Sequence, residues 1–186
     1  PITGRPFMTE VIEALTRPPD EETEVPTFDR STDRSTPRFC EPDSEENLHE
    51  LFLQQDWTDK LPIVLPTEAR VEAMLRATSR DPDHVVGQMR PTAPREAWEY
   101  TVEKVAVNAV MAGAKPEFFP VILALASTQV SARASTTSSA AAMAVINGPI
   151  REEIHMNWGV GAMGPYNHAN ATVGRAYGLL SQNGQG

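Results

Sequence analysis

Apolar residues recur at helical spacing in three stretches of the first eighty residues. Residues 6–15 and residues 46–55 each place apolar side chains on one face and predict short amphipathic helices. A third helix is predicted after Thr67, because threonine is a suitable N-cap residue. Its apolar stripe consists of Val71, Met74, Leu75 and Thr78.

The second half of the chain predicts three longer helices. Residues 94–112 combine a helical apolar repeat with a proline in the first turn and with Gly113 after the last turn, where a left-handed cap is expected. Residues 116–130 are apolar on all sides and predict a central, buried helix. Residues 167–180 predict the last helix. Its expected inward-facing residues are Ala169, Val173, Ala176, Tyr177 and Leu180.

Residues 140–146 form a short apolar run that is followed by Asn147-Gly148-Pro149, a pattern typical of a buried strand that ends in a turn. These elements predict an α/β or α+β fold that is rich in helices and has few strands. We expect a globular domain over residues 61–186. Residues 1–60 predict an acidic, proline-rich, irregular arm with short helices, which either wraps its own or a neighbouring subunit or packs as a surface loop.

The formal charge of the protein is concentrated in this arm. Residues 1–60 contain 15 acidic and 6 basic residues, a net charge of −9, whereas residues 61–186 contain 10 of each. Without a basic stripe to neutralise phosphates, the composition argues against nucleic-acid and anionic-membrane binding. The longest apolar run, residues 118–126, is too short to span a membrane. Cys40 is the single cysteine, which excludes a disulfide framework within one chain and favours a reducing, cytoplasmic location.

A glycine-rich segment near the C-terminus is the strongest candidate for a functional site. Gly159, Gly161 and Gly164 match the spacing G-x-G-x-x-G, in which backbone N–H groups can approach an anion at a helix N-terminus. A dinucleotide-binding fold also requires a strand directly before the loop and an acidic residue about 20 positions later. No acidic residue follows Glu153, so we expect a ligand-lining loop of another type.

Two histidines lie within this segment. His155 and His168 are 13 residues apart, and with Glu152 or Glu153 they are candidates for acid–base catalysis or for a divalent metal site of the His/His/carboxylate type. The spacing is not diagnostic. The alternative is that both rings form hydrogen bonds within loops.

Arginine and asparagine side chains complete the candidate site. Arg151 and Arg175 are candidates to bind a substrate carboxylate, although an ordinary ion pair explains either of them equally well. Asparagine amides beside glycine N–H groups can stabilise an oxyanion. The expected substrate-binding residues are Asn147, Arg151, Asn157, Gly161, Gly164, Asn167, Asn170 and Arg175.

From about residue 61 onward, the chain resembles the N-terminal part of an uncharacterised bacterial family associated with a U/C-G-S-C redox motif found in some selenoproteins. The resemblance is carried by LPIVLPTEARVEAML, by TVEKVAVNAVMAGAKPEFFPVILA and above all by INGPIREEIHMNWGVGAMGPYNHANATVGRA. It implies a shared site lined by Asn147, Gly148, Pro149, Asn157, Gly161, Gly164, Pro165, Asn167, Asn170 and Arg175. The C-G-S-C motif is absent from these 186 residues, so we expect a second subunit or a C-terminal region to supply the rest.

Two functions follow as hypotheses. In the first, the chain is a subunit of a small-molecule enzyme of the hydrolase or lyase type, whose pocket is formed by residues 147–175 and completed by another chain or region. In the second, it is a non-catalytic assembly subunit of a hetero-oligomer that docks through its acidic arm. Both agree with an active site at a subunit interface.

Overall fold

The structure is a computed structural model that describes residues 8–9, 12, 37–89, 98–132 and 141–184. It divides into two compact units, residues 1–38 and residues 39–186. In the first unit, Met8, Thr9 and Ile12 are helical, in agreement with the helix expected over residues 6–15, and the rest of that expected helix lies outside the described residues. Most of the expected irregular arm, residues 13–36, also lies outside them.

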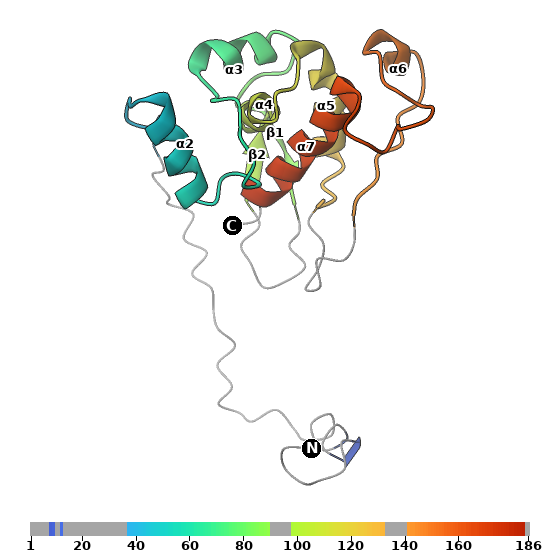
Figure 1. Cartoon of the computed structure of the whole chain (residues 1–186), viewed down its shortest axis with the longest axis horizontal. Coiled ribbons are helices and arrows are strands. Elements are labelled where there is room, and N and C mark those ends of the chain that lie inside the picture. The colour runs from blue at the N-terminus through green and yellow to red at the C-terminus, as the bar shows by residue number, and fades with distance from the viewer. Residues whose placement is uncertain (1–7, 10–11, 13–36, 90–97, 133–140, 185–186) are drawn as a thin grey trace. The chain divides into compact units, whose positions relative to one another are not determined.

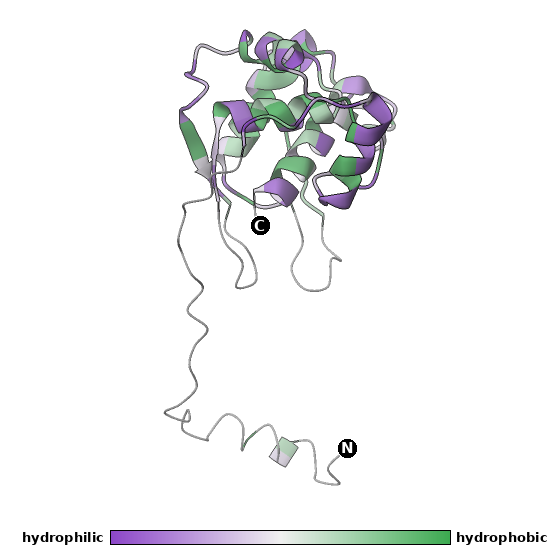
Figure 2. Ribbon diagram, turned by 90° about the vertical axis from the view of Figure 1, so that its left-hand side faces the viewer, coloured by the Kyte–Doolittle hydropathy of each residue, from purple (hydrophilic) through white to green (hydrophobic). Residues whose placement is uncertain are grey.

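The core of the second unit is built around helix α4 (Val102–Met111), which packs against α3 (Glu68–Leu75), α5 (Phe119–Ser127) and α7 (His168–Asn183) (Figure 1). Val102, Val105, Ala106 and Ala109 of α4 are fully buried. Hydrophobic and hydrophilic stretches alternate along the helices in Figure 2, as expected for helices with one face on a core.

The helices expected over residues 46–55, after Thr67 and over residues 167–180 are confirmed as α2, α3 and α7. Helix α2 (Glu45–Gln54) begins after Ser44, whose side chain accepts a hydrogen bond from the backbone N–H of Asn47. Thr67 precedes α3, although its side chain makes no capping bond. Asn167 caps α7. The five expected inward-facing residues of α7 are all buried.

The apolar helix expected over residues 116–130 is present as a 3₁₀ turn, η1 (Pro116–Phe118), followed by α5. It ends before Gln129, which has a positive φ of 58°. Gly113, with φ 78°, occupies the left-handed position expected after the preceding helix.

The prediction of a helix over residues 94–112 is wrong at its start. Residues 99–101 form strand β2 (Glu99–Thr101), which pairs antiparallel with β1 (Val85–Gln88), and α4 begins only at Val102. Thr101 caps the helix by accepting a hydrogen bond from the Lys104 N–H. Buried Tyr100 anchors the strand through its hydroxyl, which donates to the Ala126 carbonyl at 2.7 Å. Residues 90–97 lie outside the described part of the chain.

The prediction of a buried strand at residues 140–146 is also wrong. Residues 141–146 adopt no regular structure, and the side chains of Met143 and Val145 are 67% and 71% exposed. The segment is not part of the described sheet, which contains only β1 and β2. Residue 140 lies outside the described residues. The fold of the second unit is therefore helix-rich α+β.

Residues 39–60 belong to the same compact unit as the helical core. Polar side chains of α7 hold the turn that follows α2: Gln182 donates to the carbonyls of Asp56 and Thr58, and Asn183 donates to that of Trp57. Thr58 is 2% exposed, so this turn closes one side of the core. Within the described residues, no helix is both long and apolar enough to cross a membrane.

Candidate functional site

The glycine-rich segment connects α6 (Ile150–Glu153) to α7 through a loop over residues 154–167. Two of its glycines are explained by local geometry. Gly161 has a positive φ of 82°, which favours glycine. A Cβ atom at Gly164 would lie 3.0 Å from the ring of Tyr166, so the small residue allows that ring to pack against the loop backbone. His155, with φ 54°, turns the chain out of α6 into the loop.

The asparagines of the segment bind the loop to itself. Asn170 accepts a hydrogen bond from the Asn157 N–H at 3.0 Å and donates to the carbonyls of Asn157 and Ala162 at 2.8 and 2.9 Å. Asn167 caps α7 by accepting from the Asn170 N–H and donates to the His155 carbonyl at 2.9 Å. Their amides therefore fix the path of the loop.

The side chain of Asn157 completes this network. Its amide nitrogen donates to the Val160 carbonyl at 3.0 Å, and its oxygen accepts from the Gly159 N–H at 2.9 Å. Asn147 differs from the other three, because it is exposed and forms no hydrogen bond within the described part of the chain. Three of the four expected substrate-binding asparagines thus hold the loop.

The two histidines take part in different contacts. The ring of His168 donates from Nε2 to the Gly113 carbonyl at 2.9 Å and packs edge-on against Phe118, with 5.5 Å between ring centroids. It fastens the start of α7 to the turn after α4. The ring of His155 is exposed and has no hydrogen-bond partner among the described residues. In the described ranges, no three His, Cys, Asp or Glu side chains are grouped so that they could hold a metal ion.

Arg175 forms a two-point ion pair with Asp59. Its Nε and Nη2 atoms each lie 2.9 Å from an Asp59 carboxylate oxygen, and Nη2 also donates to the Pro62 carbonyl at 2.8 Å. The hydrogen bond from Arg175 holds the pKa of Asp59 below its ordinary value of 3.8 and outweighs the opposing effect of burial. The same bond raises the pKa of Arg175. This guanidinium ties α7 to residues 59–62.

Arg151 lies between the acidic end of α6 and the loop. Its guanidinium is 3.0 Å from the Glu152 carboxylate and stacks 4.3 Å from the centre of the Trp158 ring. Its Nε atom is buried and lacks a hydrogen-bond partner among the described residues. Glu153 is exposed. Glu152 is therefore paired with Arg151, and the structure does not bring it together with the two histidines.

The loop carries an exposed apolar surface that the sequence analysis did not predict. Trp158, Val160, Met163 and Tyr166, which we call the loop surface, are 58%, 103%, 83% and 87% exposed. One signal for it was available in the sequence: residues 154–174 contain no Asp, Glu, Lys or Arg, although 22% of the chain is charged. Charged side chains, which would interact with water, are thus absent from the loop, and three of its asparagine side chains form hydrogen bonds to the loop backbone instead.

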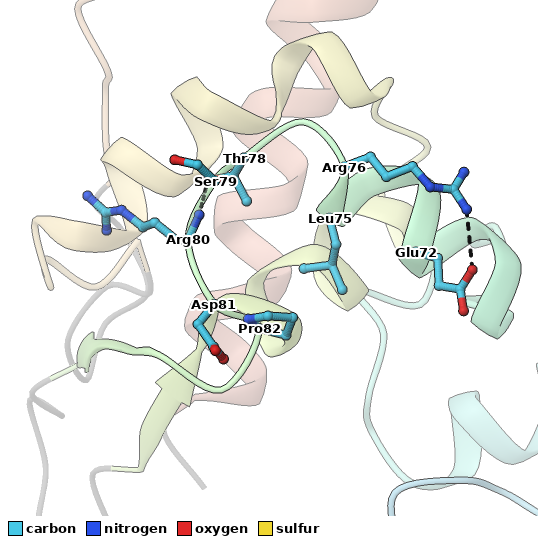
Figure 3. A pocket seen from close by; sticks show the side chains of 8 residues that line it. All are labelled: Glu72, Leu75, Arg76, Thr78, Ser79, Arg80, Asp81 and Pro82. Carbon is cyan, nitrogen blue, oxygen red and sulfur yellow. Dashed lines mark hydrogen bonds and ion pairs between the residues drawn. The ribbon is translucent and has the colours of Figure 1, made fainter.

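An open pocket of about 510 Å³ lies elsewhere, at the C-terminal end of α3 (Figure 3). Its cationic side chains do not converge, because Arg76 points toward Glu72, with 3.4 Å between the charged groups, whereas Arg80 points to the opposite side. None of the residues predicted from the glycine-rich segment lines it. The lining consists of Glu72, Leu75, Arg76, Thr78, Ser79, Arg80, Asp81 and Pro82.

Comparisons of the chain with protein-family models, with curated proteins and with solved structures found no match.

Proposed function

We propose that this chain is a subunit of a protein assembly and that its glycine-rich loop binds a second protein chain. One observation carries the proposal: a loop held in shape by asparagine side chains presents four large apolar side chains, each more than half exposed. Exposed apolar side chains that form a patch are typical of protein interaction sites, and these four come from residues 158–166 of one loop.

The composition of the loop surface fits an interface. Tryptophan, tyrosine and methionine are enriched at the centres of protein interfaces, whereas charged residues are depleted there, and residues 154–174 carry none. Burying an exposed side chain of this size contributes about 1.5–3 kcal/mol. Because the asparagine network already orders the backbone, binding would avoid much of the entropy cost of ordering a loop.

The expectation of a small-molecule enzyme remains a second proposal, with one supporting observation. His168 and Arg175 are engaged in contacts within the fold, so a hydrolase or lyase site at residues 147–175 would rely on His155, whose exposed ring is unbonded in the described part of the chain. Groups from another chain would have to complete that site. The resemblance to the U/C-G-S-C-associated family, a divalent metal, and docking through the acidic arm stay predictions.

The loop proposal is tested with Val160→Ser, Met163→Ser and the double variant. Neither side chain makes a hydrogen bond, and both are more than four-fifths exposed, so the isolated chain should keep its thermal stability. Native mass spectrometry of the assembly isolated from its source should show loss of the second chain, with at least a tenfold weaker association for the double variant.

Leu61→Ser is the matched control, because Leu61 is 58% exposed but lies outside the loop surface. This variant should leave the assembly intact. Two results would overturn the proposal: an assembly that the double variant does not weaken, or a chain that is isolated without any partner.

A further inference from the structure

Residues 141–146, with the sequence AAMAVI, have the composition of a strand but not its pairing. The segment contains no helix, turn or bend and runs as a plain coil into α6 (Figure 1). Met143 and Val145 are 67% and 71% exposed, and only Ile146 packs against the core. Five of the six apolar residues, residues 141–145, thus lie outside the hydrophobic core.

The main chain of this segment is also unpaired. No hydrogen bond joins residues 141–146 to the described part of the chain, through either the backbone or the side chains. Unpaired N–H and C=O groups along an apolar segment form a template to which another strand can add. Both main-chain edges of the segment are available for pairing.

We propose that residues 141–146 are inserted as a strand into the β-sheet of a second, different protein chain. The pattern of side chains along the segment indicates which kind of sheet it fits. Alternate residues of a strand point to opposite faces, so Met143 and Val145 share one face while Ile146 lies on the other with two alanines. Neither face is polar. Continuous apolar runs of this kind are typical of strands buried on both faces of a covered sheet.

The distribution of charge along the chain supports the same kind of partner sheet. Residues 134–150 contain no Asp, Glu, Lys or Arg, in contrast to the usual lysines and other charges that protect a solvent-exposed strand edge. An uncharged segment fits an uncharged, apolar sheet interior. The partner is therefore a protein whose β-sheet is covered on both faces and has a gap between two strands that a further strand can fill.

Pairing with a second copy of this chain would leave main-chain groups and apolar faces of residues 141–146 exposed. Two copies paired through residues 141–146 would form a two-stranded ribbon with two unpaired outer edges and two exposed apolar faces, an arrangement that is marginally stable in water. The described sheet of this chain is not a better acceptor, because it has only two strands, and Val85, Gln88 and Glu99 leave part of it exposed. The partner must contribute further strands of its own.

This inference goes beyond the proposed function, because it concerns the main chain of residues 141–146 rather than the side chains of the loop surface. The two surfaces are close in sequence: Gly148, with φ 90°, turns the chain from this segment into the short helix α6, and the loop follows α6. One partner can therefore contact both.

The test is hydrogen–deuterium exchange of the full chain, alone and in the assembly isolated from its source. We expect the amides of residues 142–146 to exchange at the rate of open chain in the free protein and at least 100-fold more slowly in the assembly. Unchanged exchange in the assembly would overturn the inference, as would protection that arises in a homodimer or the absence of any assembly.

Val145→Pro and Val145→Thr form a matched pair of variants. Proline removes the amide that pairs in a sheet, whereas threonine keeps the amide and the preference for strands. The proline variant should lose the protection of residues 142–146 in the assembly, and the threonine variant should retain most of it. Equal protection in both would overturn the inference.

Thermal unfolding of the free variants controls for stability, since an unpaired, exposed residue should tolerate both changes. The outcomes also separate the two proposals. An assembly that depends on Val160 and Met163 but leaves residues 142–146 unprotected would refute strand insertion alone. Absence of a partner would refute both proposals.

Discussion

Replacing Asn170 with alanine should release the glycine-rich loop. Its side chain forms three hydrogen bonds to loop backbone, at 2.8–3.0 Å, two with Asn157 and one with Ala162. At about 1 kcal/mol each, their loss predicts a loop less stable by about 3 kcal/mol. Because 1.4 kcal/mol corresponds to a factor of ten, the open loop should become about 100-fold more populated.

Chymotryptic cleavage after Trp158 and Tyr166 measures that population, because cleavage of a locally opened segment follows the free energy of opening when reclosing is fast. Cleavage of Asn170→Ala should be about 100-fold faster than that of the wild type. Asn147→Ala is the control, since the exposed Asn147 side chain forms no hydrogen bond within the described residues. Equal cleavage of wild type and Asn170→Ala would refute the structural role of this asparagine.

Two further predictions concern the contacts that hold the helical core. Asp59→Asn should destabilise the protein by about 2 kcal/mol at pH 7, the usual size for a hydrogen bond to a charged group. Because folding lowers the pKa of Asp59, its stabilising effect is fully present above the ordinary pKa of 3.8 and is lost as the pH falls through the folded-state pKa. Melting temperatures of the two proteins should therefore converge in acid, and a constant difference from pH 7 to pH 2.5 would contradict the assignment. Tyr100→Phe should lower the free energy of unfolding by about 1 kcal/mol and the melting temperature by about 2–4 °C. The loss is modest because the Ala126 carbonyl loses the hydrogen bond from the tyrosine but keeps the one from the Gln129 N–H at 3.2 Å. An unchanged melting temperature would show that the tyrosine hydrogen bond does not stabilise the fold.

The helical part of the fold follows from local signals that are visible in the sequence. Ser44 and Asn167 act as N-caps, and the inward-facing residues of α7 keep a single helical repeat. The predicted start of α4 is too early because the apolar repeat reaches back from Val102 to Trp98, although Tyr100 between them is buried from strand β2. A capping threonine at Thr101 was the available signal.

The candidate site could be located from the sequence, but the roles of its residues could not. Asparagine and arginine side chains beside glycines fit ligand binding and loop stabilisation equally well before partners are known. Asp59, which pairs with Arg175, is 116 residues away in sequence, so no local pattern connects the two. The composition of residues 141–146 predicts a strand. Whether the segment pairs as one depends on which strands lie beside it in space, and this is not visible in the local sequence.

Hydroxyl-radical footprinting of the loop surface tests the central claim most directly, because tryptophan, methionine and tyrosine side chains react readily when exposed. The measurement compares oxidation of Trp158, Met163 and Tyr166 in the free chain and in the isolated assembly, with Trp57, which is 37% exposed, as the internal reference. A role of the loop in partner binding predicts at least fivefold slower oxidation of these three residues in the assembly and an unchanged rate at Trp57. Equal oxidation of the three residues in both samples would contradict it.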